Sequence, residues 1–134
     1  MVCFTRRMNW ISPTALLVSI VMIPLSATDA ENVHFNRDIR PILAENCFYC
    51  HGQDANKRKA DLRLDEEAAA LAAKAIVPHR PTESRLIQRI HSADPEEQMP
   101  PLDSNRRLST QQKQLLEQWI AEGGRFDTHW AFVK

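Results

Sequence analysis

The sequence predicts a small all-α domain. Apolar residues recur at spacings of three and four in several segments, which is the period of a helix with one buried face. The last such segment opens with a Ser-x-x-Gln capping box and stops at paired glycines, the usual signals for the two ends of a helix. With 134 residues and no internal repeat, the chain is long enough for one domain of this class.

The first thirty residues differ from the rest, since 18 of them are hydrophobic. Arg6 and Arg7 form a positive start, an apolar stretch covers residues 11–25, and Thr28-Asp29-Ala30 resembles a cleavage site. We therefore expect residues 1–30 to be a secretory signal peptide. The alternative is an uncleaved membrane anchor, although the stretch is short for a span and two prolines interrupt it.

The charge of the remaining chain is nearly balanced, with 15 basic and 16 acidic side chains. Nucleic-acid binding and polybasic membrane-surface binding normally need a basic excess on one face. We expect no nucleic-acid partner, and no membrane contact of the mature form unless the leader is retained as an anchor.

A first helix is expected after the leader. Its apolar face is formed by residues at i, i+4, i+7 and i+8, namely Phe35, Ile39, Ile42 and Leu43. Asp38 as the N-cap would place Pro41 in the first turn, where the missing proline N–H does no harm.

The strongest motif follows that helix as Cys47-Phe48-Tyr49-Cys50-His51. This pattern is typical of covalent c-type haem attachment. On one helical turn the positions i, i+3 and i+4 share a face. Cys47 and Cys50 can then form thioether bonds to one haem, while His51 serves as an axial ligand of its iron. The third cysteine, Cys3, lies in the leader.

Three other interpretations of the cysteine pair fit the sequence less well. A thioredoxin-like site needs a βαβ setting, and no strand is predicted before the motif. A zinc site needs a fourth ligand, and no further cysteine follows the leader. A structural disulfide would leave His51 unexplained.

Met99 is the candidate for the second axial ligand of the iron, because His/Met ligation is known in c-type cytochromes. Pro100 favours an extended backbone at Met99, and Pro100-Pro101 stiffens the loop. The alternative is that Met99 fills a gap in the core. Four histidines are rival ligands, and each is more typical of a surface position: His34, His79, His91 and His129.

Two short helices are expected between the motif and Met99. Asp65 could cap an alanine-rich helix over residues 66–74. Another helix is expected to begin at Pro81, with a buried stripe made by Leu86, Ile87 and Ile90.

The last helix has the clearest signals. Ser109 and Gln112 form its capping box, and Gly123-Gly124 ends it. Its apolar stripe consists of Leu115, Leu116, Trp119 and Ile120, which we expect to pack in the core.

The basic run Lys57-Arg58-Lys59, with Arg63 nearby, has two interpretations. A charge run is usually a solvated face. The sharper hypothesis is that Arg58 or Arg63 binds a haem propionate, because Arg makes bidentate contacts with carboxylates.

These segments resemble the planctomycete-type cytochrome c domain over essentially the whole chain after the leader. The resemblance rests on the cysteine motif followed by Gly52 and on five further segments: Phe35 to Leu43, Lys57 to Asp65, Met99-Pro100-Pro101, Trp119 to Gly123, and His129 to Phe132. It implies a small cytochrome c-like helical domain wrapped around one covalently attached haem. Cys47 and Cys50 match the family's attachment positions, and His51 and Met99 match its axial ligands.

The resemblance also bears on domain organisation. It implies a cytochrome c domain over residues 31–127 and a linker-like tail over 128–134, since the family's domain usually precedes further domains of a longer exported protein. Both a stand-alone carrier and a shortened form remain open. One departure is Pro78-His79-Arg80-Pro81, where the family usually has a Gly-Asp turn before the proline.

Together these features predict an exported, periplasmic monohaem c-type cytochrome. We expect it to pass single electrons between redox partner proteins and not to act as an enzyme. The alternative is a haem-bearing sensor or docking module without steady electron flux.

Overall fold

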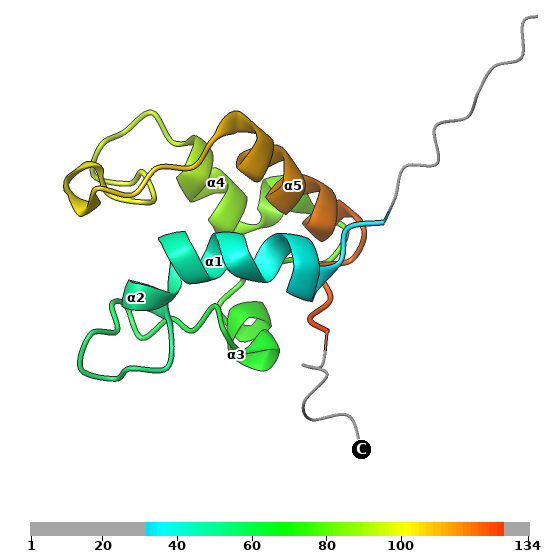
Figure 1. The fold of residues 1–134 in the computed structure, drawn as a ribbon, viewed down its shortest axis with the longest axis horizontal. Helices are drawn as coiled ribbons and strands as arrows, with labels where there is room; N and C mark the ends of the chain where they lie inside the picture. The colour runs from blue at the N-terminus through cyan, green and yellow to red at the C-terminus, as the bar shows by residue number, and fades with distance from the viewer. Residues whose placement is uncertain (1–31, 128–134) are drawn as a thin grey trace, which may run out of the picture. The chain divides into compact units, whose positions relative to one another are not determined.

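The computed structural model describes residues 32–127. The predicted signal peptide, the tail 128–134 and His129 lie outside these residues. Within residues 32–127 the chain forms helices and loops and no strand, so the all-α prediction is confirmed (Figure 1). None of these helices is both long and apolar enough to cross a membrane. Their bounds are η1 Phe35–Ile39, α1 Arg40–Asn46, α2 Phe48–His51, α3 Glu67–Ala72, η2 Pro81–Glu83, α4 Arg85–His91, η3 Leu102–Ser104 and α5 Thr110–Ala121.

The first helix starts earlier than predicted, with a π-helical turn, η1, that runs directly into α1. Pro41 has no N–H for an α-type bond, and the Arg40 N–H bonds the carbonyl of Phe35, five residues back. Asp38 is therefore not the N-cap, which was predicted wrongly. It lies inside the turn, and its carboxylate accepts a hydrogen bond from the backbone N–H of His34 at 2.9 Å.

The predicted apolar faces of the first and last helices meet in the core. All four apolar residues of the first helix are buried, as are Leu116, Trp119 and Ile120 of α5, whereas Leu115 is half-buried. The rings of Phe35, Trp119 and Phe126 lie 4.4–5.5 Å apart, centre to centre. This aromatic cluster joins η1 to α5 and to the segment that follows it.

Both ends of α5 form as predicted. The Ser109 hydroxyl accepts from the Gln112 N–H at 3.1 Å, and the Gln112 side chain accepts from the Ser109 N–H at 2.9 Å. After Ala121 the chain turns through Gly123 and Gly124, whose φ angles are 117° and 61°. A β-carbon on Gly124 would lie 2.8 Å from the Ile76 side chain, so glycine is needed there for space as well as for conformation.

The alanine-rich helix α3 is shorter than predicted, and Asp65 does not cap it. The N-cap is Glu66, which makes no side-chain capping bond. The Asp65 carboxylate instead accepts two hydrogen bonds from the guanidinium of Arg63, at 2.7 and 3.2 Å. The Asp65 carboxylate thus binds the Arg63 guanidinium and not the backbone N–H groups at the start of α3 that a capping residue would bind.

The predicted helix from Pro81 is divided at Ser84. A 3₁₀ turn, η2, precedes Ser84 and α4 follows it, because Ser84 has an extended backbone with ψ of 121°. Its hydroxyl is fully buried; it accepts from the Val77 N–H at 2.8 Å and donates to the Arg80 carbonyl at 3.0 Å. The predicted stripe is nevertheless confirmed, since Leu86, Ile87 and Ile90 are buried.

Candidate haem site

The cysteine motif forms one helical turn at the end of the first helix. Cys47 is the N-cap of α2, and its carbonyl accepts from the N–H groups of Cys50 at 3.1 Å and His51 at 2.9 Å. The two cysteines are not joined by a disulfide. The turn therefore has the i, i+3, i+4 arrangement that attachment to one planar group needs.

A cavity of about 560 Å³ lies against this turn. Cys47, Cys50 and His51 line it, and so does Met99, which comes from a different segment 48 residues later. Most of the remaining wall is apolar and includes Leu62, Leu64, Ala73, Ala75, Leu86, Ile90, Pro100 and Pro101. The size and the apolar wall are typical of a cofactor site.

Met99 reaches the cavity from the loop between α4 and α5. Its backbone N–H donates to the carbonyl of Arg89 at 3.0 Å, which fixes the loop against α4. The Arg89 guanidinium also donates to the carbonyl of Glu97 at 3.3 Å. Met99 is half-buried and is not part of the buried core, while the next residue, Pro100, is buried.

The rival histidines in the described residues lie away from the cavity lining. The His79 ring packs on Gly123 and bonds the carbonyl of Ala121 at 3.1 Å. His91 is paired with Glu117 of α5, and His34 is the N-cap of η1.

Burial sets the protonation of two motif side chains. It raises the pKa of the Cys47 thiol to about 12, an effect that the positive charge of Arg106 opposes, so the free thiol is neutral at neutral pH. Burial also lowers the pKa of His51, with the backbone of Lys59 acting in the opposite direction. A neutral imidazole is the form that binds metals.

His51 carries the clearest sign that the site is made for another group. Its Nδ1 atom is buried and has no hydrogen-bond partner among the described residues. Buried polar atoms without a partner are rare and costly, so such an atom calls for an explanation. Two thiols and an imidazole beside an apolar cavity fit a covalently held haem, and the thioether of Met99 lines the same cavity. No cluster of three or more His, Cys, Asp or Glu side chains within residues 32–127 could hold a metal ion.

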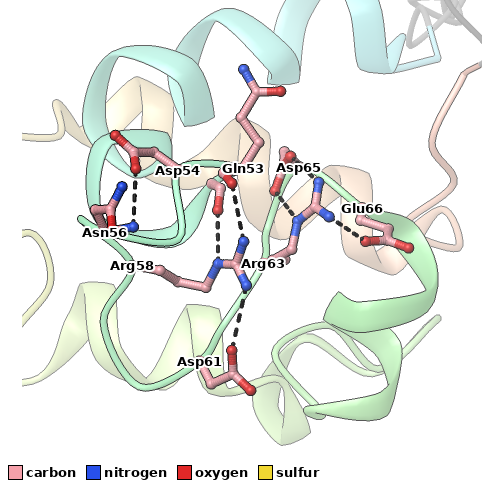
Figure 2. A network of polar contacts seen from close by, with 9 residues as sticks. Gln53, Asp54, Asn56, Arg58, Asp61, Arg63, Asp65 and Glu66 are labelled. Carbon is pink, nitrogen blue, oxygen red and sulfur yellow. Dashed lines mark hydrogen bonds and ion pairs between the residues drawn. The ribbon is translucent and has the colours of Figure 1, made fainter.

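The two arginines predicted to contact propionates are bound to neighbouring groups in the loop after the motif (Figure 2). The Arg58 guanidinium donates to the carbonyls of Gly52 at 3.0 Å and Gln53 at 3.1 Å. Arg63 is paired with Asp65 and Glu66. Neither arginine is among the residues that line the cavity, so their contact with a propionate stays a prediction.

Three other cations line the cavity: Lys59, Arg85 and Arg106. Lys59 belongs to the basic run 57–59, in which Arg58 and not Lys59 was predicted to contact a propionate, and Arg85 and Arg106 were not predicted from the sequence. The sequence signal for Arg85 is its position directly before the buried stripe of α4. Lys59 and Arg106 belong to irregular segments, in which no periodicity indicates the direction of a side chain.

One comparison with known proteins matches the segment that contains the cysteine motif. The family model described as Planctomycete cytochrome C matches residues 47–103, a segment that begins at Cys47 and includes Met99. This match confirms the resemblance inferred from the sequence, over a shorter range than expected, since it does not extend to the first helix or to α5. Neither the curated proteins nor the solved structures include a significant match.

Proposed function

We propose that this chain, whose residues 47–103 match the planctomycete cytochrome c family, is an exported monohaem c-type cytochrome that carries single electrons. One observation carries the proposal. The Cys47–His51 turn and Met99, from separate segments, line the same apolar cavity. This arrangement supports thioether attachment through the two cysteines and axial ligation by His51 and Met99.

Ligation by both His51 and Met99 would leave no open position on the iron, which suits electron transfer better than catalysis. A bound haem would supply the one-electron chemistry. The Met99 N–H donates to the carbonyl of Arg89, which fixes the backbone that carries the proposed sulfur ligand. A fixed backbone at this position would limit the rearrangement that accompanies electron transfer. A thioether ligand also favours the reduced iron and raises the potential.

The proposal is tested by expressing the full chain in a bacterium that attaches haem in its periplasm. We expect the intact mass to increase by one haem and to lack the leader, and we expect a reduced spectrum of a six-coordinate c-type haem. A protein with free thiols and no haem absorbance would refute the proposal. A five-coordinate ferrous spectrum would instead favour a sensor module.

The ligand assignment is tested separately at Met99. We predict that Met99→Ala opens a coordination position, so the reduced protein binds carbon monoxide, and that Met99→His lowers the reduction potential. His91→Ala is the matched control, because His91 lies outside the cavity and is paired with Glu117. An unchanged visible spectrum of Met99→Ala would contradict the assignment.

A further inference from the structure

The charged residues of the cavity lining are unbalanced. Lys59, Arg85 and Arg106 are cationic, and Asp103 is the single carboxylate among the lining residues within 32–127. An apolar wall with an excess of positive charge is complementary to an apolar molecule that carries carboxylates. A haem is such a molecule, since its two propionates remain ionised at neutral pH.

The three cations differ in what already binds them. The guanidinium of Arg106 donates to the carbonyl of Glu45 at 3.1 Å and stacks on the ring of Tyr49 at 4.9 Å. The Arg106 side chain therefore already has protein partners, as does Arg58 in the loop after the cysteine motif.

Lys59 and Arg85 are different. Neither side chain has a hydrogen-bond or ion-pair partner among residues 32–127, although both are exposed at the cavity. Their backbones are held, because the Lys59 N–H donates to the carbonyl of Cys50 at 2.8 Å and the Arg85 N–H donates to that of Lys74 at 3.1 Å. Lys59 and Arg85 thus have fixed backbones, and their side chains line one cavity without a protein partner among residues 32–127.

We propose that Arg85 and Lys59 bind the two haem propionates. This inference rests on the proposed function, since it names residues of the same site. Arg85 suits a bidentate contact with one carboxylate, and Lys59 supplies a point charge to the other. Their positive charges disfavour the oxidised, more positive iron, so at a pH where the propionates are ionised both residues keep the potential high. The same charges lower the pKa of the propionates.

The test is the reduction potential of the haem-loaded protein, measured from acid to mildly alkaline pH. We expect Arg85→Gln and Lys59→Gln each to lower the potential. The potential of the wild type should fall as the pH rises and the propionates ionise. Each variant should shift the pH of this fall to a higher value, by about one unit or more, because a carboxyl that loses a nearby cation regains its ordinary pKa. Arg85→Lys should restore most of the wild-type curve, which a purely structural role would not predict. Arg125→Gln is the matched control, since it removes the same charge from an exposed residue outside the cavity lining.

The outcomes separate the two proposals. If the wild-type protein carries no haem, the proposed function fails and this inference fails with it. If the protein carries its haem but Arg85→Gln and Lys59→Gln leave the curve like that of Arg125→Gln, only the propionate assignment is overturned. A shift seen in Arg58→Gln or Arg63→Gln, and in neither of the proposed residues, would also overturn it.

Discussion

Asp65 shows how one neighbouring residue sets the charge of a side chain. The hydrogen bonds from Arg63 lower the pKa of Asp65 below its ordinary value of 3.8, and partial burial opposes them. The ionised carboxylate therefore stabilises the folded state above pH 3.8, and this contribution is lost as the pH falls through the lowered pKa.

We predict that Arg63→Gln raises the pKa of Asp65 to its ordinary value or above. The measurement is an NMR titration of the Asp65 carboxyl carbon. Arg80→Gln is the control, because Arg80 is paired with Glu83 and not with Asp65. A titration curve of Asp65 that is the same in Arg63→Gln and in the wild type would contradict the role given to Arg63.

His79 has a backbone conformation that glycine adopts more easily than other residues. Its φ angle is 62°, in the left-handed region that residues with a β-carbon disfavour. Contacts of the His79 ring with Ala121 and Gly123 stabilise the histidine in this conformation.

This explanation predicts an order of stability for two variants. His79→Gly and His79→Ala both remove the ring, but only alanine keeps the β-carbon. We expect His79→Gly to be more stable than His79→Ala by about 1 kcal/mol in urea unfolding. Equal stability would show that the left-handed backbone costs nothing at this position.

The capping box is the clearest contribution at the scale of a single element. Ser109 and Gln112 satisfy two N–H groups that the start of α5 would otherwise leave without partners. We predict that Ser109→Ala destabilises the protein by about 1 kcal/mol, measured as a change in the free energy of unfolding. The neighbouring Thr110→Ala is the control, since the Thr110 hydroxyl takes no part in the box. Equal effects would indicate a general cost of removing a hydroxyl.

Two elements departed from their sequence patterns for local reasons. Pro41 removes one backbone donor, and the turn before it widens into the π-helical η1. The buried hydroxyl of Ser84 binds Val77 and Arg80, and these bonds hold an extended residue where the apolar period alone predicts a continuous helix. Periodicity reports which residues are buried, but it does not report such competing hydrogen bonds.

At the scale of the whole molecule, Trp119 connects the first and last helices. Its ring contacts Phe35 and Phe126, and its Nε1 donates to the carbonyl of Arg125 at 2.9 Å. We predict that Trp119→Ala lowers the free energy of unfolding by about 3–5 kcal/mol, the usual cost of deleting a buried aromatic ring.

Trp119→Phe provides the comparison for this prediction. It keeps a ring against Phe35 and loses the bond to Arg125, so its effect in the same denaturation measurement should be clearly smaller. If the two variants unfolded at the same denaturant concentration, the hydrogen bond, and not the packing, would be the main contribution of Trp119.

The sequence by itself determined the features that depend on local spacing. The Cys47–His51 turn, the capping box of α5 and the buried stripes of the helices all follow from periods of three and four residues, which side chains on one helix must obey. The candidate Met99 also followed from local chemistry, through the prolines beside it.

Only the tertiary structure decided which charged side chains reach the cavity. Arg58 and Arg63 looked like suitable cations, yet carbonyls and carboxylates of their own loop bind them. Lys59 and Arg85 come from segments that are separate in the sequence and meet at the cavity lining. A long, flexible cation follows whichever partners the fold brings near it, and no sequence period encodes that choice.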